Sequence, residues 1–322
     1  MSIQQATVFG GSGFIGRYVV RELARAGINV RVAVRRPDRA LFLKPAGDVG
    51  QVTPVHANVR DDASVAAAIE GADLVVNLVG ILFPHGKQNF DAVHREAAGR
   101  IAAAARDAGV ARLVHVSAIG ADEASPSNYG KSKAAGEAAV AAAFPDATIF
   151  RPGIVVGAED SFFNLFATYA RLSPVLPLVG GGATKFQPVA VADVAAAVVA
   201  AATRPDCAGR IYEVCGPRVY SFKELLELML AEIHRRRLLV PVPFAAARLM
   251  ALPFDWFPLP LEWLPMQVVT RDQVSMLGVD NVAGGEHPGL NDLDIDPALI
   301  ESVLPTYLGR YRRAGERAGA VT

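Results

Sequence analysis

The 322-residue sequence has few cysteines and no excess of either charge. Its two cysteines, Cys207 and Cys215, lack metal-ligand spacing and make no disulfide framework, which favours a reducing compartment. Basic and acidic residues number 32 each, so the zero net charge gives no support for nucleic acid as a partner. His56, His94 and His115 are isolated in the sequence, and we therefore expect no metal site.

The chain also has no stretch of about 18 uncharged apolar residues, which is the length that suggests a membrane-spanning helix. Its first residues, MSIQQATVFG, run directly into a strand pattern without the basic and apolar regions of a secretory signal. We therefore expect a cytoplasmic protein. Hydrophobic residues make up 52% of the chain, which is enough to form a sizeable folded core.

Short apolar runs alternate with helical patterns through the first half of the chain. Strands are expected at 6–9, 29–34, 51–56, 73–80, 112–117 and 147–152, with helices at 16–27, 63–72 and 95–110. This alternation predicts an α/β fold of the Rossmann type, with a doubly wound parallel sheet. We place this domain at 1–150 and expect 151–322 to complete the sheet and form a smaller subdomain that faces a substrate or partner.

A glycine-rich turn lies between the first expected strand and helix, in VFGGSGFIGRYVV. Gly10 permits the tight turn, Gly13 lets the backbone approach a pyrophosphate, and Gly16 lets the helix pack closely on the strand. The helix start adds free N–H groups and partial positive charge. An ordinary glycine-rich turn is the alternative, but the flanking strand and helix argue against it. The predicted cofactor-binding residues of this turn are Gly10, Ser12, Gly13, Phe14, Ile15 and Gly16.

The end of the second expected strand predicts which dinucleotide binds. NAD sites commonly carry an acidic residue there, whereas this chain has Arg35 and Arg36. Guanidinium groups suit a 2′-phosphate and offer nothing special to a free ribose diol. We therefore predict NADP(H) over NAD(H). The alternative is that one or both arginines are solvated surface charges.

A tyrosine and a lysine lie four positions apart in HVSAIGADEASPSNYGKSK. On a helix, Tyr129 and Lys133 would share one face. A lysine ammonium beside a phenol should lower the phenol pKa from about 10, which suits proton transfer during hydride transfer. The question is whether the pair performs this chemistry or only holds a cofactor.

Together these features resemble the short-chain dehydrogenase/reductase superfamily in its extended or atypical branch. The resemblance implies that Asn58 and Val59 lie against the adenine, with Asn58 replacing the usual aspartate. It further implies cofactor contacts for Val79, Gly80 and Pro152, the last in an Arg-Pro turn beside the nicotinamide.

The resemblance also implies roles in catalysis and points to one departure. Lys133 would bind the nicotinamide ribose, and Tyr129 would act as general acid or base. Active members usually end the preceding strand in two hydroxyl residues, but here Ser117 is followed by Ala118. A methyl group cannot donate a hydrogen bond to an oxyanion, and losing such a donor costs about two to three orders of magnitude in rate. A small register shift would let Ser117 take this role, so Ser117 is included among the predicted catalytic residues with Tyr129 and Lys133.

A longer resemblance covers nearly the whole chain, in segments such as DLVVNLVGILF, LVHVSAIGADEASPSNYGKSKAAGE and FQPVAVADVA. These are similar to the bacterial form of the nucleotide-binding accessory subunit of respiratory complex I, the alpha subcomplex member nine family. The resemblance implies a tightly bound structural NADPH and docking near the membrane end of the complex I hydrophilic arm. The alternative is an active NADP-dependent oxidoreductase, epimerase or dehydratase acting on a carbonyl, sugar-nucleotide or quinone-related substrate.

The stretch 238–270 is apolar and interrupted by prolines, and it contains both tryptophans, Trp256 and Trp263. The basic cluster HRRR at 234–237 lies immediately before it. Such a combination can engage anionic lipid headgroups. We therefore consider that 234–270 contacts a membrane surface or a hydrophobic partner, which would make the protein peripheral at the inner face of the cytoplasmic membrane. The alternative is that the stretch packs in the core of the second subdomain.

Overall fold

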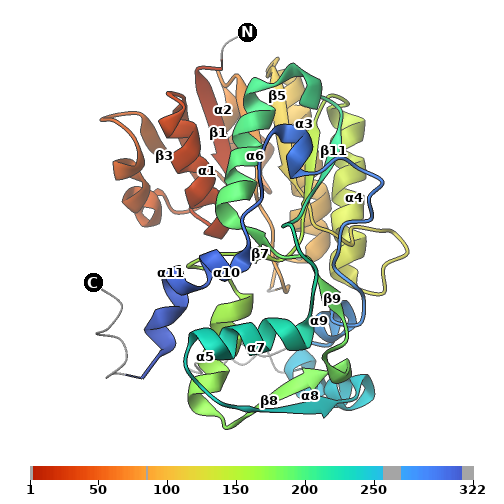
Figure 1. The fold of residues 1–322 in the computed structure, drawn as a ribbon. Helices are drawn as coiled ribbons and strands as arrows, with labels where there is room; N and C mark the ends of the chain where they lie inside the picture. Colours follow the sequence, from red (N-terminus) through yellow and green to blue (C-terminus); the bar gives the residue numbers. More distant parts are fainter. Residues whose placement is uncertain (1–2, 85, 257–269, 314–322) are drawn as a thin grey trace, which may run out of the picture. The chain divides into compact units, whose positions relative to one another are not determined.

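A computed structural model describes residues 3–84, 86–256 and 270–313 (Figure 1). The chain divides into two compact units. The first combines Met1–Pro152, Val191–Val214 and Gly284–Asp296, and the second combines Gly153–Ala190, Cys215–Ala283 and Pro297–Thr322. Two segments of the half predicted as the C-terminal part thus belong to the first unit.

A seven-stranded sheet forms the centre of the first unit. Its strands are β1 (Gln5–Phe9), β2 (Asn29–Val34), β3 (Val52–His56), β4 (Leu74–Asn77), β5 (Arg112–Val116), β6 (Thr148–Pro152) and β11 (Ile211–Val214). Their order is β11-β6-β5-β4-β1-β2-β3, and every pairing is parallel. The order reverses between β1 and β4, which is where doubly wound sheets bind ligands beyond the carboxyl ends of their strands.

Helices cover both faces of this sheet (Figure 1). They are α1 (Phe14–Arg25), η1 (Pro37–Ala46), α2 (Asp62–Ile69), η2 (Asp91–Glu96), α3 (Ala97–Asp107), α4 (Asn128–Ala143), α6 (Val191–Thr203), η4 (Pro205–Cys207) and η6 (Leu290–Leu293). Helices α1 and α6 pack together, and α3 packs between α2 and α4. Alanines of α2 and α3 allow these helices to approach strands that carry buried Phe9, Val75 and Leu113.

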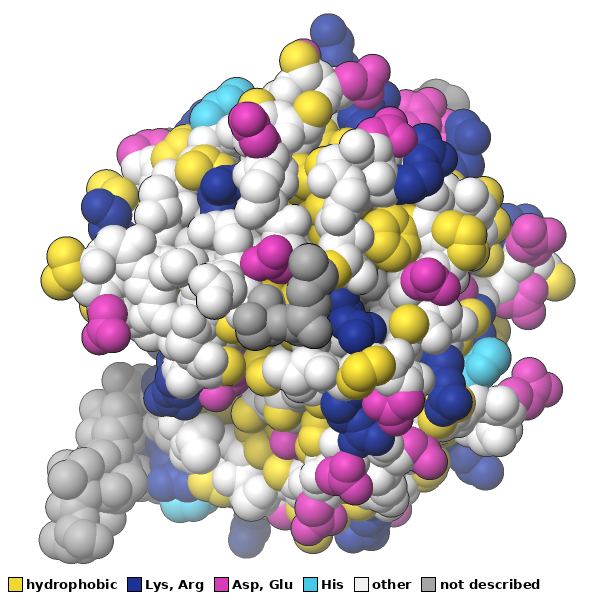
Figure 2. Space-filling view, turned by 90° about the horizontal axis from the view of Figure 1, so that it is seen from above, with side chains coloured by type: hydrophobic (Ala, Val, Ile, Leu, Met, Phe, Trp, Pro, Cys, Tyr) yellow, Lys and Arg dark blue, Asp and Glu magenta, His cyan; other side chains and the backbone are white. Residues whose placement is uncertain are grey.

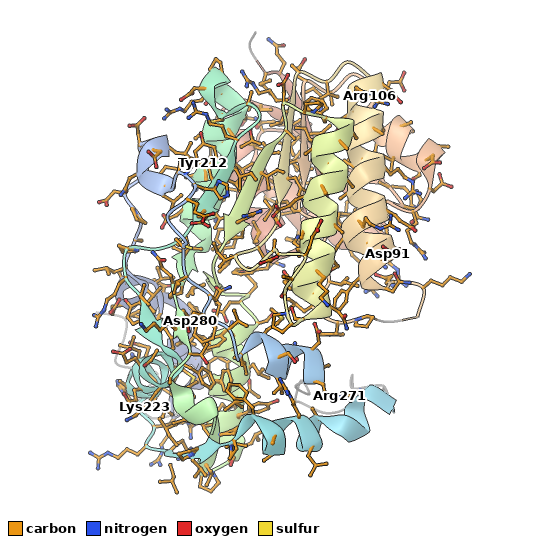
Figure 3. All side chains as sticks on the ribbon, turned by 90° about the vertical axis from the view of Figure 1, so that its right-hand side faces the viewer. Asp91, Arg106, Tyr212, Lys223, Arg271 and Asp280 are labelled. Carbon is orange, nitrogen blue, oxygen red and sulfur yellow. The ribbon has the colours of Figure 1, made fainter. Side chains whose placement is uncertain are left out.

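Two predicted boundaries differ from the structure in an informative way. Strand β4 is shorter than the predicted 73–80 because Asn77 ends it, its Oδ1 accepting a hydrogen bond from the Val79 N–H at 3.1 Å. The helix predicted at 95–110 is preceded by a π-helical turn, η2, which α3 continues. Figure 3 shows Asp91 and Arg106 toward opposite ends of this combined helical segment.

The second unit is built from short strands and helices around an aromatic core. Its elements are β7 (Val155–Val156), α5 (Phe162–Leu172), β8 (Val175–Val179), η3 (Gly180–Gly182), β9 (Lys185–Phe186), β10 (Val189–Ala190), β12 (Tyr220–Ser221), α7 (Phe222–Glu232), β13 (Leu238–Val242), α8 (Phe244–Trp256), α9 (Arg271–Met276), α10 (Ile300–Val303), α11 (Pro305–Leu308) and η7 (Gly309–Tyr311). The rings of Phe162, Phe166 and Phe222 meet edge to face within this core.

On the face in Figure 2, basic and acidic side chains are interspersed. Among the described residues, no helix combines the length and apolar character needed to cross a bilayer. The predicted contact region 234–270 is described only in part. Residues 257–269, with Trp263, lie outside the described residues, whereas β13 and α8 are present.

Candidate functional site

The glycine turn after β1 is packed so closely that side chains are excluded at two of its positions. A Cβ on Gly16 would lie 2.3 Å from the Gly10 carbonyl oxygen, so this position tolerates only glycine. Gly10 has a φ of +78°, and a Cβ there would lie 3.1 Å from the Leu78 carbonyl carbon. The loops after β1 and β4 therefore touch at the point where the strand order reverses.

The start of α1 differs from the starts of its neighbours. Gly13 is the N-cap of α1, and no side chain caps this helix. By contrast, Asp61 caps α2 and Ser127 caps α4, each by accepting a backbone N–H. An uncapped helix start beside an exposed glycine leaves N–H groups for an anion, and the turn therefore fits a pyrophosphate.

Arg35 and Arg36 follow β2, the strand next to β1, and both side chains are exposed. Within the described ranges, neither guanidinium group forms an ion pair or a hydrogen bond. The Arg36 carbonyl accepts the Arg39 N–H at 3.1 Å, which begins η1. The two charges thus lie one strand away from the glycine turn and remain free to meet a ligand phosphate.

Asn58 and Val59 form the loop after β3 and are half-buried. The Asn58 Oδ1 accepts the Arg60 N–H at 3.2 Å, and its own N–H donates to Ser64 Oγ at 2.9 Å. The Val59 carbonyl accepts from Arg100 Nη1 at 3.0 Å. These contacts define the backbone at the position where the family resemblance expects the adenine.

Lys133 is buried within the first unit, near the end of β5. Its Nζ donates to the Val116 carbonyl at 2.8 Å, and burial lowers its pKa to about 8. Tyr129 lies one turn earlier on α4, and burial raises the pKa of its phenol to about 12. The predicted lowering of the Tyr129 pKa is therefore wrong for this structure. Loss of solvation disfavours the charged phenolate and so raises the pKa of the Tyr129 phenol.

The hydroxyl expected to polarise a substrate is not accessible. Ser117 follows β5, and its N–H donates to the Phe150 carbonyl at 2.7 Å. Its Oγ is buried and has no hydrogen-bond partner among the described residues. The following residue, Ala118, carries no donor. A carbonyl substrate could be polarised here only if Ser117 were to move.

An ion pair between Glu137 on α4, one turn beyond Lys133, and Arg151 on β6 links this helix to the sheet. The Arg151 guanidinium, on β6, binds the Glu137 carboxylate in a two-pronged arrangement, with Nη2 to Oε2 at 2.6 Å and Nε to Oε1 at 3.0 Å. This pairing raises the Arg151 pKa. Pro152, the predicted nicotinamide contact, ends β6, and its carbonyl accepts the Ile119 N–H at 2.9 Å.

Sequence reasoning treated the histidines as isolated and missed a buried polar cluster. His115, on β5, faces Asn77 on β4, with Asn77 Nδ2 to His115 Nδ1 at 3.1 Å. His94 on η2 bonds to Ile81 and Ser132. These partners are far apart in the sequence, so no local pattern could have revealed them. The polar Asn77 at the end of an apolar strand was the one available signal.

All the predicted site residues therefore lie in the first unit, in the loops that follow β1 to β5, at the end of β6, or on α1 and α4. Backbone contacts join the loops after β1 and β4, and those after β5 and β6. This arrangement fits an extended dinucleotide, with phosphates on the glycine turn.

Comparisons with known proteins agree with this geometry. A family model described as NAD(P)H-binding matches residues 10–205. The mitochondrial NADH dehydrogenase (ubiquinone) 1 alpha subcomplex subunit 9 of Arabidopsis thaliana is 38% identical over 324 residues, covering 98% of this chain and 80% of the plant protein. A ceramide reductase of Caulobacter vibrioides is 36% identical over 199 residues, covering 62% of this chain and 61% of that protein.

Solved structures share the fold at low sequence identity. A nucleoside-diphosphate-sugar epimerase from Staphylococcus aureus superposes with a TM-score of 0.71 at 18% identity, covering 94% of this chain and 100% of that one. An NADPH-dependent quinone oxidoreductase from Escherichia coli, in complex with NADPH, gives 0.70 at 19%, covering 94% and 99%. The predicted Rossmann-type fold is thus confirmed. The chain belongs to the NAD(P)H-binding family of atypical short-chain dehydrogenase/reductases and is a homologue of alpha subcomplex subunit 9 of NADH:ubiquinone oxidoreductase.

Proposed function

We propose that this protein is an NADP(H)-binding accessory protein of NADH:ubiquinone oxidoreductase, in which the cofactor is held as part of the structure. The observation that carries this proposal is the buried Ser117 Oγ beside Ala118, which leaves no accessible serine or threonine hydroxyl at the end of β5 to polarise a substrate carbonyl. The dinucleotide would bind along the glycine turn and stabilise the first unit, because a ligand that binds only the folded state adds stability.

The proposed preference for NADP(H) rests on two exposed charges. Arg35 and Arg36 lie at the end of β2 without protein partners in the described part of the chain. A 2′-phosphate would gain charge-assisted hydrogen bonds from either one. NADH lacks this phosphate, and its affinity should depend little on these side chains.

The test is a cofactor-selectivity measurement by isothermal titration calorimetry. The double variant Arg35→Ala/Arg36→Ala should weaken NADPH binding by about 10- to 100-fold and NADH binding less than about threefold. Arg106→Ala is the matched control, because it removes an arginine from the far end of α3 (Figure 3). Equal losses for NADPH and NADH would contradict the 2′-phosphate assignment.

The structural role is tested by exchange and turnover. Mass spectrometry of the purified protein should identify NADPH that neither exchanges quickly nor oxidises with carbonyl or quinone acceptors. Rapid turnover that Tyr129→Phe abolishes would instead establish an enzyme, with Tyr129 as the acid or base and Lys133 orienting the ribose.

That second function, an NADP-dependent oxidoreductase, epimerase or dehydratase, is favoured by one observation. Tyr129 and Lys133 are both retained on one face of α4, although a scaffold needs the lysine and not obviously the tyrosine. The similarity to a ceramide reductase over 199 residues adds a relative whose printed name is that of an enzyme. Its substrate class would be a carbonyl, sugar-nucleotide or quinone-related compound.

We further propose that the second unit contacts a membrane surface or a hydrophobic partner of the complex I arm. In this unit Leu238 on β13 is 65% exposed and pairs in register with Val175 on β8, which is 39% exposed. Exposed Arg236 lies beside them in the sequence. The protein would then be peripheral at the inner face of the cytoplasmic membrane.

Co-sedimentation with anionic vesicles tests the membrane contact. The variant Leu238→Ser should reduce the fraction of protein that sediments with the vesicles. A wild-type protein that stays in the supernatant at low salt would contradict lipid contact.

A further inference from the structure

His94 is held by hydrogen bonds at both ring nitrogens. Its Nε2 accepts the backbone N–H of Ile81 at 3.0 Å, and its Nδ1 lies 2.8 Å from Ser132 Oγ. The side chain is buried, and it lies on the π-helical turn η2. Single π-helical turns of this kind are frequent at functional sites.

The contacts allow one assignment of the protons on this ring. The Ser132 hydroxyl donates to the Tyr129 carbonyl at 2.7 Å, so Ser132 can only accept from His94. His94 therefore carries its proton on Nδ1, while Nε2 accepts from Ile81. Three hydrogen bonds then run in one direction, from the Ile81 N–H through His94 and Ser132 to the Tyr129 carbonyl.

The two ends of this chain of bonds belong to different parts of the predicted site. Ile81 directly follows Val79 and Gly80, in the loop after β4 that touches the glycine turn. At the other end, Ser132 neighbours Lys133 on α4. The His94 side chain thus connects the loop after β4 with the helix that carries Tyr129 and Lys133.

Ring packing and a close helix approach hold His94 in this position. The Phe90 ring stacks on the imidazole at 5.4 Å, and the Tyr129 ring meets it edge-on at 5.5 Å. A Cβ on Gly136 would lie 2.2 Å from the His94 carbonyl oxygen, so only glycine lets η2 lie this close to α4. Figure 3 places Asp91, also on η2, at the end of this helical segment that lies away from Arg106.

We propose that His94, as the neutral Nδ1–H tautomer, is a positioning residue that aligns the loop after β4 with Tyr129 and Lys133 for dinucleotide binding. This proposal rests on the proposed cofactor site. The imidazole acts through its hydrogen bonds to the backbone N–H of Ile81 and to the Ser132 hydroxyl.

The tautomer is tested by long-range proton–nitrogen NMR of protein labelled with ¹⁵N-histidine. The chain has six histidines, and the His94→Phe variant assigns the resonance of interest. At about pH 7, His94 should show a protonated Nδ1 and a non-protonated Nε2, both with and without NADPH. An imidazolium or an Nε2–H tautomer would overturn the proposal, whether or not the protein binds NADPH.

The positioning role is tested by NADPH affinity. His94→Phe keeps a ring between Phe90 and Tyr129 but removes both hydrogen bonds, and should weaken NADPH by about tenfold. Ser132→Ala should weaken it about threefold, and the double variant should match His94→Phe alone, because both changes break one network. The matched control, His287→Phe in the same unit, should leave affinity unchanged.

The outcomes separate the two proposals. No NADPH binding by the wild-type protein would refute the cofactor proposal, and the NMR measurement would still decide the tautomer. Wild-type binding with unchanged affinity in His94→Phe would refute the positioning role alone. If His94→Phe fails to fold, Ser132→Ala decides: unchanged affinity refutes the role, and a loss of affinity in protein that is still fully folded at the temperature of the titration supports it.

Discussion

The two ends of the proposed dinucleotide site are built in opposite ways. At the end of β2, Arg35 and Arg36 are exposed and have no protein partner among the described residues. Near the ends of β4 and β5, by contrast, His94, His115 and Lys133 are buried and hydrogen-bonded to the protein. One end keeps its charges in water until a ligand arrives, and the other forms its contacts during folding.

This difference shows which residues would select between ligands and which would fix the geometry of the site. Exposed guanidinium groups can discriminate between ligands by charge, at little cost to the fold. Burying a polar group is costly without hydrogen-bond partners, so the paired groups at this end, such as His94 and Lys133, are held firmly in position. We therefore expect changes at the arginines to alter which ligand binds, and changes at the buried cluster to alter both stability and binding.

The glycine turn joins the two ends, and breaking it should have the largest effect. Gly16→Ala would place a Cβ 2.3 Å from the Gly10 oxygen and 2.6 Å from the Gly11 Cα. We expect unfolding free energy to fall by about 1–3 kcal/mol and NADPH affinity by at least about 100-fold. Calorimetric titration measures this, with Gly309→Ala as the control, since a Cβ there meets nothing within 4 Å. Wild-type affinity in Gly16→Ala would exclude the turn as the phosphate site.

Lowering the pH should reduce the unfolding free energy through the buried histidines. Burial lowers the pKa of His94 from 6.5 to about 3, and it also lowers that of His115. The unfolded chain therefore binds more protons, and this stability is present above pH 6.5 and is lost as pH falls toward 3. For His94 this loss should be about 2 kcal/mol by about pH 5.

Urea titrations at several pH values measure this loss. The difference between wild type and His94→Phe isolates the contribution of His94, because other groups that titrate in this range are shared. His287→Phe serves as the control, and it should follow the wild-type curve. If wild type and His94→Phe lose stability in parallel between about pH 7 and 5, the buried neutral state of His94 is excluded.

Added salt should weaken NADPH binding through the exposed arginines, because solvent ions screen exposed charges. Raising NaCl from about 0.05 to 0.5 M shortens the Debye length and should weaken NADPH binding about fivefold, with little change for NADH. The ratio of affinities between wild type and His94→Phe should stay constant, because buried contacts are poorly screened. Titrations at four salt concentrations give both slopes. Equal slopes for NADPH and NADH would mean that the arginines do not bind the 2′-phosphate.

The smallest effect should come from the ring that stacks on His94. Phe90→Leu removes the stacked ring at 5.4 Å but keeps the hydrogen bonds to Ile81 and Ser132. NADPH affinity should fall about two- to threefold. Fluorescence titration can resolve such a change. A loss as large as that of His94→Phe would mean that stacking, and not hydrogen bonding, carries the alignment.

The sequence alone indicated six of the seven strands of the sheet, the glycine turn and the shared face of Tyr129 and Lys133, but not strand β11. These features depend on how apolar residues, glycines and the Tyr–Lys pair are spaced along the chain, and this spacing can be read directly from the sequence. It also predicted that Arg35 and Arg36 follow a strand, since the β2 pattern ends directly before them. The strand and helix ends were less well predicted, because the Asn77 side chain ends β4 and a π turn precedes α3.

Only the tertiary structure decided the electrostatics and the partners. The Tyr129 pKa rises instead of falling because burial disfavours the charged phenolate, and burial depends on the whole unit. His94 finds Ile81 13 positions away and Ser132 38 positions away, and no local pattern encodes such pairs. Hydrogen-bond partners and solvation are set by three-dimensional packing, so they appear only once the sheet and its helices have assembled.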